Sequence, residues 1–533
     1  MRRIILLNAA LFAALQLYSQ NLNPQVQVTN DYQTRMADVS KLELQMQVPD
    51  SLGEFATDVD YSVFQTDYKG AYEFNPYAIK VTPKAGDYSG RRLYLRAGAG
   101  FSFHPVLNAV YTPVRKGLHR MNFYNEFNGY AGRYHQAVGD SFNGYDYSER
   151  LGAEGRLNDE DFDLRWNAAW KGNFNKDSFT RSIYNGVNLS TNISSNSDTT
   201  QLYYNFSMKA GFATDRFSNG ALGRVNEFSY IVDGTIGPEI YHHMIRLLID
   251  IHTQNSVYNT AFSEPLNLSY LRPRAVFDWG PLNVSAGVSL CTGGKGLGLY
   301  PDVQASLMLW KDALNVYGGF GGGQFAENYS ALKERDSWVN SGYLHNFKST
   351  VEQFRFDLGL RGSAASKFEY DLHGGFASYA RAAVDMIGPS IDSTAIVGKM
   401  AYRDYKVWFF DTNLAWRSER FDADASMSVR KTSIGDDKTF LDLPLFSASL
   451  TALYNWDRRI YGGMRVKGAT ARYSSAYEVK GFVDLGFYGE YRFNNKLSAW
   501  GQLGNILCND VPLSPMHAQH GMHFTAGITL RLQ

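Results

Sequence analysis

Hydrophobic and polar residues alternate with a period of two along most of the chain, from Arg91 to the C-terminus. Successive side chains of a β-strand point to opposite faces, so each alternating segment predicts a strand with one apolar and one polar wall. In the last strand, the apolar face is Phe524, Ala526, Ile528, Leu530 and Leu532. The polar face is His523, Thr525, Gly527, Thr529 and Arg531.

Charged residues lie in the middle of the polar faces, where a packed protein core would not tolerate them without partners. A water-filled lumen does tolerate them, which favours a barrel over a soluble sandwich. We expect the following residues on the lumen wall: Arg355, Asp357, Arg361, Asp484, Glu490 and Arg492. Aromatic residues gather near strand ends, as at Trp408, Trp416, Trp456 and Tyr491. This placement is typical of the interfacial girdles of membrane barrels.

Short polar turns and longer polar connections alternate, and they allow the strands to be counted. Ten short turns are expected at 115–117, 158–160, 195–198, 237–239, 279–281, 310–312, 363–366, 417–419, 456–458 and 494–496. Longer connections are expected near 131–144, 214–225, 255–266, 321–350, 381–402, 431–440 and 506–520. With both chain ends on the turn side, this predicts an all-β, transmembrane antiparallel barrel of about 22 strands, with roughly 14 to 24 as the range. The count requires an extra strand near Ile183–Ile193.

The first nineteen residues have the pattern of a cleaved signal peptide. Arg2 and Arg3 precede the apolar run Ile4–Leu17, and the small residue Ser19 offers a cleavage point. After residue 19 no apolar run approaches the roughly 18 residues that a membrane helix needs. We therefore expect residues 1–19 to direct export, residues 20–90 to form a short periplasmic or lumenal segment, and residues 91–533 to form a barrel in the cell outer membrane.

Composition narrows the function further. The 533 residues include 35 Tyr, 34 Phe and 49 Gly but only 20% charged residues, which is unusual for a soluble enzyme. Lys+Arg and Asp+Glu both total 52, so no basic field suggests a nucleic-acid partner. The only cysteines, Cys291 and Cys508, exclude a disulfide scaffold and a Cys-based zinc site. One disulfide and two free thiols both remain open.

Several short motifs resemble TonB-dependent-receptor-like outer-membrane barrels. They are Leu22–Tyr32, Asp60–Val63, Asn75–Lys84, Tyr94–Gly100 with His104-Pro105 and Tyr111, and Tyr300–Val303. The resemblance implies a transport barrel. However, the roughly 70 residues before the first strand are too few for the plug domain of the family, so a complete plug is not expected. A TonB box, which would pair with TonB by strand addition, is sought at Val26, Gln27, Val28, Thr29 and Asn30.

Motifs for catalysis are lacking. The sequence contains no G-x-S-x-G elbow, phosphate-binding loop or metalloprotease helix, so we expect neither an enzyme nor a resident cofactor. An outer-membrane hydrolase, with acid and base assembled across strands, is the least favoured alternative. The run 516–523 contains His517, His520 and His523, whose imidazoles suit copper or zinc if the loop brings them together.

Two functions therefore remain in view. The first is an integral outer-membrane barrel that binds or passes a solute through its lumen, with the N-terminal segment, inward-folded loops or a partner filling the opening. The second is a non-transporting structural or assembly subunit of an outer-membrane protein complex. Expected partners are membrane lipid and either other envelope proteins or TonB.

Overall fold

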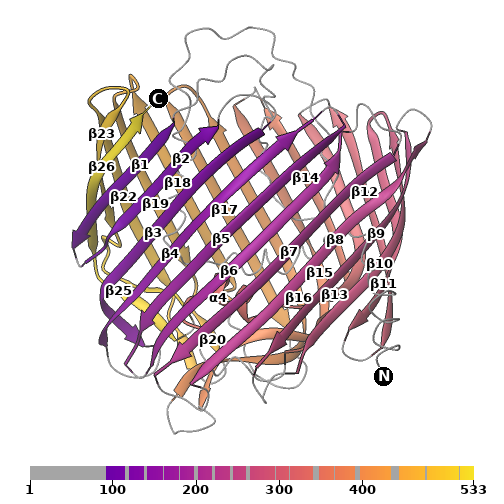
Figure 1. Cartoon of the computed structure of the whole chain (residues 1–533), viewed down its shortest axis with the longest axis horizontal. Coiled ribbons are helices and arrows are strands. Elements are labelled where there is room, and N and C mark those ends of the chain that lie inside the picture. Colours follow the sequence, from indigo (N-terminus) through magenta and orange to yellow (C-terminus); the bar gives the residue numbers. More distant parts are fainter. Residues whose placement is uncertain are drawn as a thin grey trace.

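The first strand of the structure pairs with the last, so the sheet closes on itself. In β1 (Leu93–Phe101) and β26 (His523–Leu532), Leu93 lies opposite Leu532 and Phe101 opposite Phe524. The computed structural model describes residues 92–532 apart from 102, 115–118, 137–140, 160, 179, 197–201, 219–222, 241–243, 260–263, 294–295, 311–312, 340–346, 365–366, 390–395, 434–442, 475–476 and 515. The closed antiparallel barrel has 22 strands (Figure 1), which confirms the fold class and the best count expected from the sequence.

The strands follow one another around the barrel in chain order. Between β1 and β26 they are β2 (Val106–Val114), β3 (His119–Gln136), β4 (Phe142–Asn158), β5 (Phe162–Lys176), β6 (Arg181–Ser195), β7 (Leu202–Phe217), β8 (Arg224–Ile240), β9 (Ile245–Tyr258), β10 (Leu266–Trp279), β11 (Leu282–Gly293), β12 (Leu297–Trp310), β13 (Leu314–Phe325), β14 (Thr350–Ala364), β15 (Phe368–Pro389), β16 (Ile396–Arg417), β17 (Phe421–Ser433), β18 (Phe446–Trp456), β19 (Ile460–Ala469), β22 (Phe482–Arg492) and β23 (Leu497–Gly504). The remaining elements lie in connections: α4 (Tyr329–Arg335), the hairpin β20 (Arg472–Ser474) and β21 (Tyr477–Val479), and β24 (Asp510–Pro512) with β25 (His517–His520).

Nine of the ten predicted short turns fall between the strands expected. The extra strand near Ile183–Ile193 is β6. The turn predicted at 237–239 is wrong, because β8 continues to Ile240. Glu239 lies opposite Arg246 and extends the ladder with a pair of opposite charges, and the chain turns only afterwards. Pro238 faces Leu202, the first residue of β7, where a missing N–H donor interrupts little of the ladder.

The exposure pattern is the reverse of that in a soluble protein. On β14, Phe356 is 53% exposed and Leu358 is 55% exposed, whereas Asp357 between them is 2% exposed. The same alternation of exposed apolar and buried polar residues recurs around the barrel. Only a surface that contacts lipid makes this arrangement stable, so the outer wall matches the hydrocarbon of a bilayer. Separately, no helix among the described residues has the length and apolarity needed to cross a membrane.

Aromatic side chains mark the two edges of this apolar surface. Trp416 and Trp408 lie eight residues apart on the outward face of β16, and both are exposed. With the rise and tilt typical of barrel strands, eight residues span roughly 20 Å along the membrane normal. Trp279, Trp310 and Trp456 are also exposed at the turn ends of their strands. The aromatic girdle expected from the sequence therefore lies at the turn end, with Trp408 near the opposite edge.

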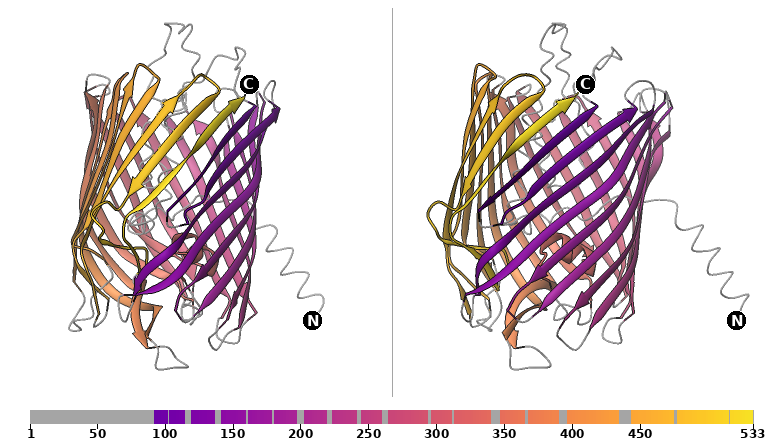
Figure 2. Two further views of the ribbon diagram at one scale, coloured as in Figure 1. Left: turned by 90° about the vertical axis from the view of Figure 1, so that its left-hand side faces the viewer. Right: turned by 60° about the vertical axis from the view of Figure 1, so that its left-hand side comes forward.

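The end of the barrel with short turns also holds the C-terminal strand end, at the top of Figures 1 and 2. Short turns face the periplasm in bacterial barrels, so the opposite end is the outer mouth. There, the connections predicted at 131–144 and 381–402 are shorter than expected, because β3, β4, β15 and β16 extend further. The β15–β16 hairpin accommodates its length through a register shift between Tyr379 and Ala382, with Arg381 at a φ of 52°.

Candidate functional site: the lumen and its closed outer mouth

The six charged residues expected on the lumen wall lie on the inward faces of β14 and β22. Five of them are buried, and Arg361 is partly exposed. Arg355 pairs with Asp357 at 3.6 Å, and its guanidinium lies 4.4 Å from the ring centroid of Phe409. Asp484 lies 3.6 Å from Arg465 on the neighbouring strand. The wall therefore carries charges of both signs, each held by a partner on the same strand or on a neighbouring strand.

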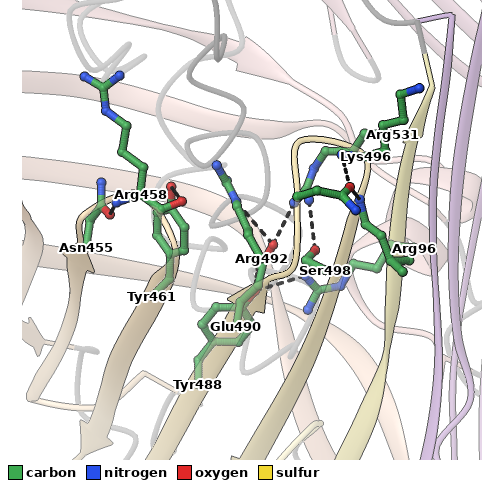
Figure 3. A network of polar contacts seen from close by, with 12 residues as sticks. Arg96, Asn455, Arg458, Tyr461, Tyr488, Glu490, Arg492, Lys496, Ser498 and Arg531 are labelled. Carbon is green, nitrogen blue, oxygen red and sulfur yellow. Dashed lines mark hydrogen bonds and ion pairs between the residues drawn. The ribbon is translucent and has the colours of Figure 1, made fainter.

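A polar network centred on Glu490 lies at the barrel seam (Figure 3). Arg531 of the last strand donates to the carboxylate of Glu490 at 2.8 Å, and Tyr488 donates to it at 2.6 Å. Arg96 of the first strand donates to Tyr488 at 3.2 Å and stacks 3.8 Å from the ring centroid of Trp500. Arg492 lies 3.6 Å from Glu490. These contacts join β1, β22, β23 and β26, so the network ties the closing strands together as well as lining the lumen.

The connection between β13 and β14 folds inward and carries the helix α4, which lies between the barrel walls in Figure 2. Asn328 caps the helix by accepting a hydrogen bond from the Ala331 amide. Lys333 and Arg335 occupy the last turn, where positive charge interacts favourably with the helix dipole. The sequence predicted a longer outer connection at 321–350 and inward-folded loops as one possible filler of the lumen, but it did not assign the inward fold or a helix to this connection.

Lys333 forms the central contact between this connection and the barrel wall. Its ammonium lies 3.0 Å from the carboxylate of Asp215 on β7, and neither side chain is exposed. Lys333 also donates to the hydroxyl of Ser182 at 2.9 Å and to the carbonyl of Ser337 at 3.0 Å. Asp215 accepts from Tyr329 at 2.7 Å and from Ser182 at 2.7 Å. All three ammonium donors are therefore satisfied, which makes burial of this pair tolerable.

Further polar contacts extend from the inward connection to other strands. Ser337 donates to Asp146 of β4 at 2.9 Å. Arg335 donates to Asp385 of β15 at 2.9 Å and to Glu327 at 2.7 Å. The connection is thus attached both to β4 and to β15, which lie far apart around the barrel.

An apolar cluster surrounds these polar contacts. Its buried members are Tyr184, Ala213, Phe217, Val225, Tyr258, Leu266, Leu268, Ala326, Tyr329, Leu332, Val339, Phe347 and Met400. They come from β6 to β10, from the inward connection and from β16. A core that joins walls ten strands apart fills lumen space near the outer mouth. The sequence suggested that the N-terminal segment, an inward-folded loop or a partner protein would fill the lumen. Among the described residues, an inward-folded loop does so.

The connection between β23 and β26 meets the inward connection at an aromatic stack. The rings of Trp338 and His517 lie 4.3 Å apart between centroids and are nearly parallel. The tip of β15 joins the same region, since Ile387 packs with Val479 and Met516 in a small buried cluster. Connections from four parts of the barrel therefore contact one another at the outer mouth.

The three histidines considered for metal binding do not meet at one point. His517 stacks on Trp338 and contacts Ser514, whereas His523 lies beside His104 with ring centroids 5.3 Å apart. Among the described residues, His520 is the one of the three that belongs to a group with ligand geometry, together with His135 and Asp510. Sequence reasoning missed this group because His135 and Asp510 are 375 residues apart.

Some sequence expectations fall elsewhere. The signal peptide, the segment 20–90 and the TonB box Val26–Asn30 lie outside the described residues. Both cysteines are free thiols, Cys291 buried and Cys508 exposed.

A closed 22-strand barrel with an apolar outer wall and a polar lumen defines an integral outer-membrane β-barrel. No protein-family model matches the chain. No curated protein matches its sequence.

Solved structures do match in three dimensions. The copper transporter OprC has a TM-score of 0.61 at 11% identity, over 83% of this chain and 80% of that one. The FrpB iron transporter from Neisseria meningitidis has a TM-score of 0.62 at 8% identity, over 83% and 82%. The siderophore receptor PirA from Acinetobacter baumannii has a TM-score of 0.59 at 9% identity, over 83% and 80%. At these identities the likeness concerns the fold, and it confirms the resemblance to TonB-dependent receptor barrels at that level.

Proposed function

We propose that this protein binds or passes a solute through its lumen, and that the inward connection between β13 and β14 acts as the gate. The observation that carries the proposal is the position of α4 inside the barrel, held by the buried Lys333–Asp215 pair. The fold that this chain shares with receptors and transporters supports a transport role.

The contacts of the gate suit a segment that moves. Besides its apolar packing, the connection is held by polar contacts from Lys333, Arg335 and Ser337, which can be exchanged for water or for polar groups of a solute. The gate would take over the closure that a complete plug provides in related receptors. Use of TonB through Val26–Asn30 remains part of the proposal, and loss of uptake on deleting those five residues would support it.

A reversible cross-link tests the gate. The hydroxyl of Ser337 donates to the carboxylate of Asp146 at 2.9 Å, so we expect cysteines at the two positions to form a disulfide, which a thiol assay on the purified protein verifies. The variant is Ser337→Cys with Asp146→Cys, in a chain where Cys291 and Cys508 are replaced by serine. In planar bilayers we expect channel openings in the reduced protein, few in the oxidised protein, and recovery after adding a reductant.

The matched control carries only Ser337→Cys and should not respond to oxidation. Equal conductance of the locked and unlocked double variants would contradict the gate. If neither the wild type nor the reduced variant conducts or takes up solute, and stable envelope partners co-purify, the structural-subunit function is favoured. The buried apolar cluster that contains Leu332 and Val339 is the observation that favours this structural function.

A further inference from the structure

His135, Asp510 and His520 converge at the outer mouth through strand register. The β24–β25 hairpin pairs Asp510 directly opposite His520. Strand β25 also pairs with the outer end of β3, where Ala518 lies opposite His135. Since His520 is two residues from Ala518, it shares a face with His135 as a diagonal neighbour. Three side chains from three strand segments therefore point to the same side of a small sheet.

The three side chains already contact one another. The Nδ1 atoms of His135 and His520 lie 2.9 Å and 2.7 Å from the Asp510 carboxylate. The two imidazole rings are nearly parallel, with centroids 4.3 Å apart. An aspartate carboxylate is ionised at neutral pH, so Asp510 offers an anionic ligand beside the two imidazoles.

We propose that His135, Asp510 and His520 form a binding site for a divalent transition-metal ion such as Zn²⁺ or Cu²⁺. Two imidazole nitrogens and one carboxylate oxygen are the donor set that such ions prefer over Mg²⁺ or Ca²⁺. Ligand atoms from the three residues lie within 4.8 Å of one another. An ion about 2.0–2.1 Å from each ligand needs ligand atoms roughly 3.3 Å apart, which a small side-chain rotation provides.

The three side chains are partly exposed to solvent, so an ion bound to them could take a further ligand. The side chains of His135, Asp510 and His520 are each about one-third exposed. Three protein ligands with solvent access leave a coordination position for water or for a group on a bound solute. A metal here would also fasten β25, and with it the β23–β26 connection, to the barrel wall at β3.

Zn²⁺ titration of the detergent-solubilised full chain, against a chromophoric chelator, tests this assignment. We expect the wild type to bind one more equivalent of Zn²⁺ than the His135→Ala/His520→Ala variant. Asp510→Asn keeps the size of the side chain and an oxygen acceptor. It should weaken Zn²⁺ binding at this site by at least tenfold. Mutation of a residue that only hydrogen-bonds to a metal ligand already lowers metal affinity by about that factor.

The matched control is His119→Ala, because His119 is an exposed histidine at the turn end of the same strand β3. It should leave binding at the mouth unchanged. Circular dichroism verifies that each variant is folded. If the double variant does not fold, the comparison of wild type with Asp510→Asn tests the proposal. Equal Zn²⁺ stoichiometry and affinity in wild type and Asp510→Asn, or no binding by the wild type, would overturn the proposal.

Discussion

The ammonium of Lys333 lies 3.0 Å from the carboxylate of Asp215, and both side chains are fully buried inside the barrel. Removing one member of a buried ion pair leaves the other charge without compensation, at a cost of about 3–5 kcal/mol. Lys333→Met should therefore favour release of α4 from the wall.

We expect Lys333→Met to increase channel openings in planar bilayers and to speed protease cleavage within 326–349. Lys333→Met with Asp215→Asn should restore closure in part, since no uncompensated charge remains. Lys496→Met changes an exposed lysine in a turn and is the control. Unchanged openings and unchanged cleavage in the single variant would show that this pair does not hold the gate.

The stack between Trp338 and His517 should couple two connections energetically. Aromatic pairs contribute about 0.5–1.5 kcal/mol beyond the area they bury. In a double-mutant cycle of Trp338→Ala and His517→Ala, the two effects on thermal stability should fall short of additivity by about that amount. Trp338→Ala combined with His119→Ala is the control cycle and should be additive. An additive result for both cycles would mean that the connections move independently.

The two faces of β14 should respond differently to charge. Phe356→Arg places a cation on the lipid-facing wall near the middle of the strand, where it should reduce the free energy of unfolding by about 2–4 kcal/mol. Ser363→Arg adds the same cation on the inward face of β14, two residues from Arg361, and is the comparison. Guanidinium unfolding in lipid vesicles measures both. A smaller loss for Phe356→Arg would argue against lipid at that wall.

The proposed metal site should make the β23–β26 connection less accessible. Added Zn²⁺ should slow proteolysis within 505–522, and a chelator should reverse the protection, because the ion would hold β25 on β3. His135→Ala/His520→Ala should show no protection. Protection that persists in that variant would place the responsible ion elsewhere.

Much of the barrel could be predicted because lipid and lumen impose opposite polarity on adjacent residues. Phe356 and Asp357 differ by one position and face different solvents, so the pattern is visible in the chain itself. Strand number followed from turn chemistry, and the error at 237–239 arose because the pairing of Glu239 with Arg246 outweighs the turn preference of Gly237 and Pro238.

The outer mouth was less predictable because its contacts are not local. Nothing near Lys333 in the sequence indicates Asp215 as its partner, and His135 meets Asp510 only after the barrel has closed. The apolar spacing of Tyr329 and Leu332 with Asn328 ahead of them was the one local signal for α4. Such a short pattern does not distinguish a helix in solvent from one inside a barrel.

The pairing of Leu93 with Leu532 has a consequence for biogenesis. A contact between residues this far apart in the sequence has a high contact order, so the ladder forms only after the final strand of the barrel has been synthesised and secreted. Until then, an assembling intermediate carries two unpaired edges, and an unpaired edge is an aggregation hazard in water and is not stable in hydrocarbon. A nascent chain of this kind therefore depends on chaperones that shield the edges until the final strand arrives.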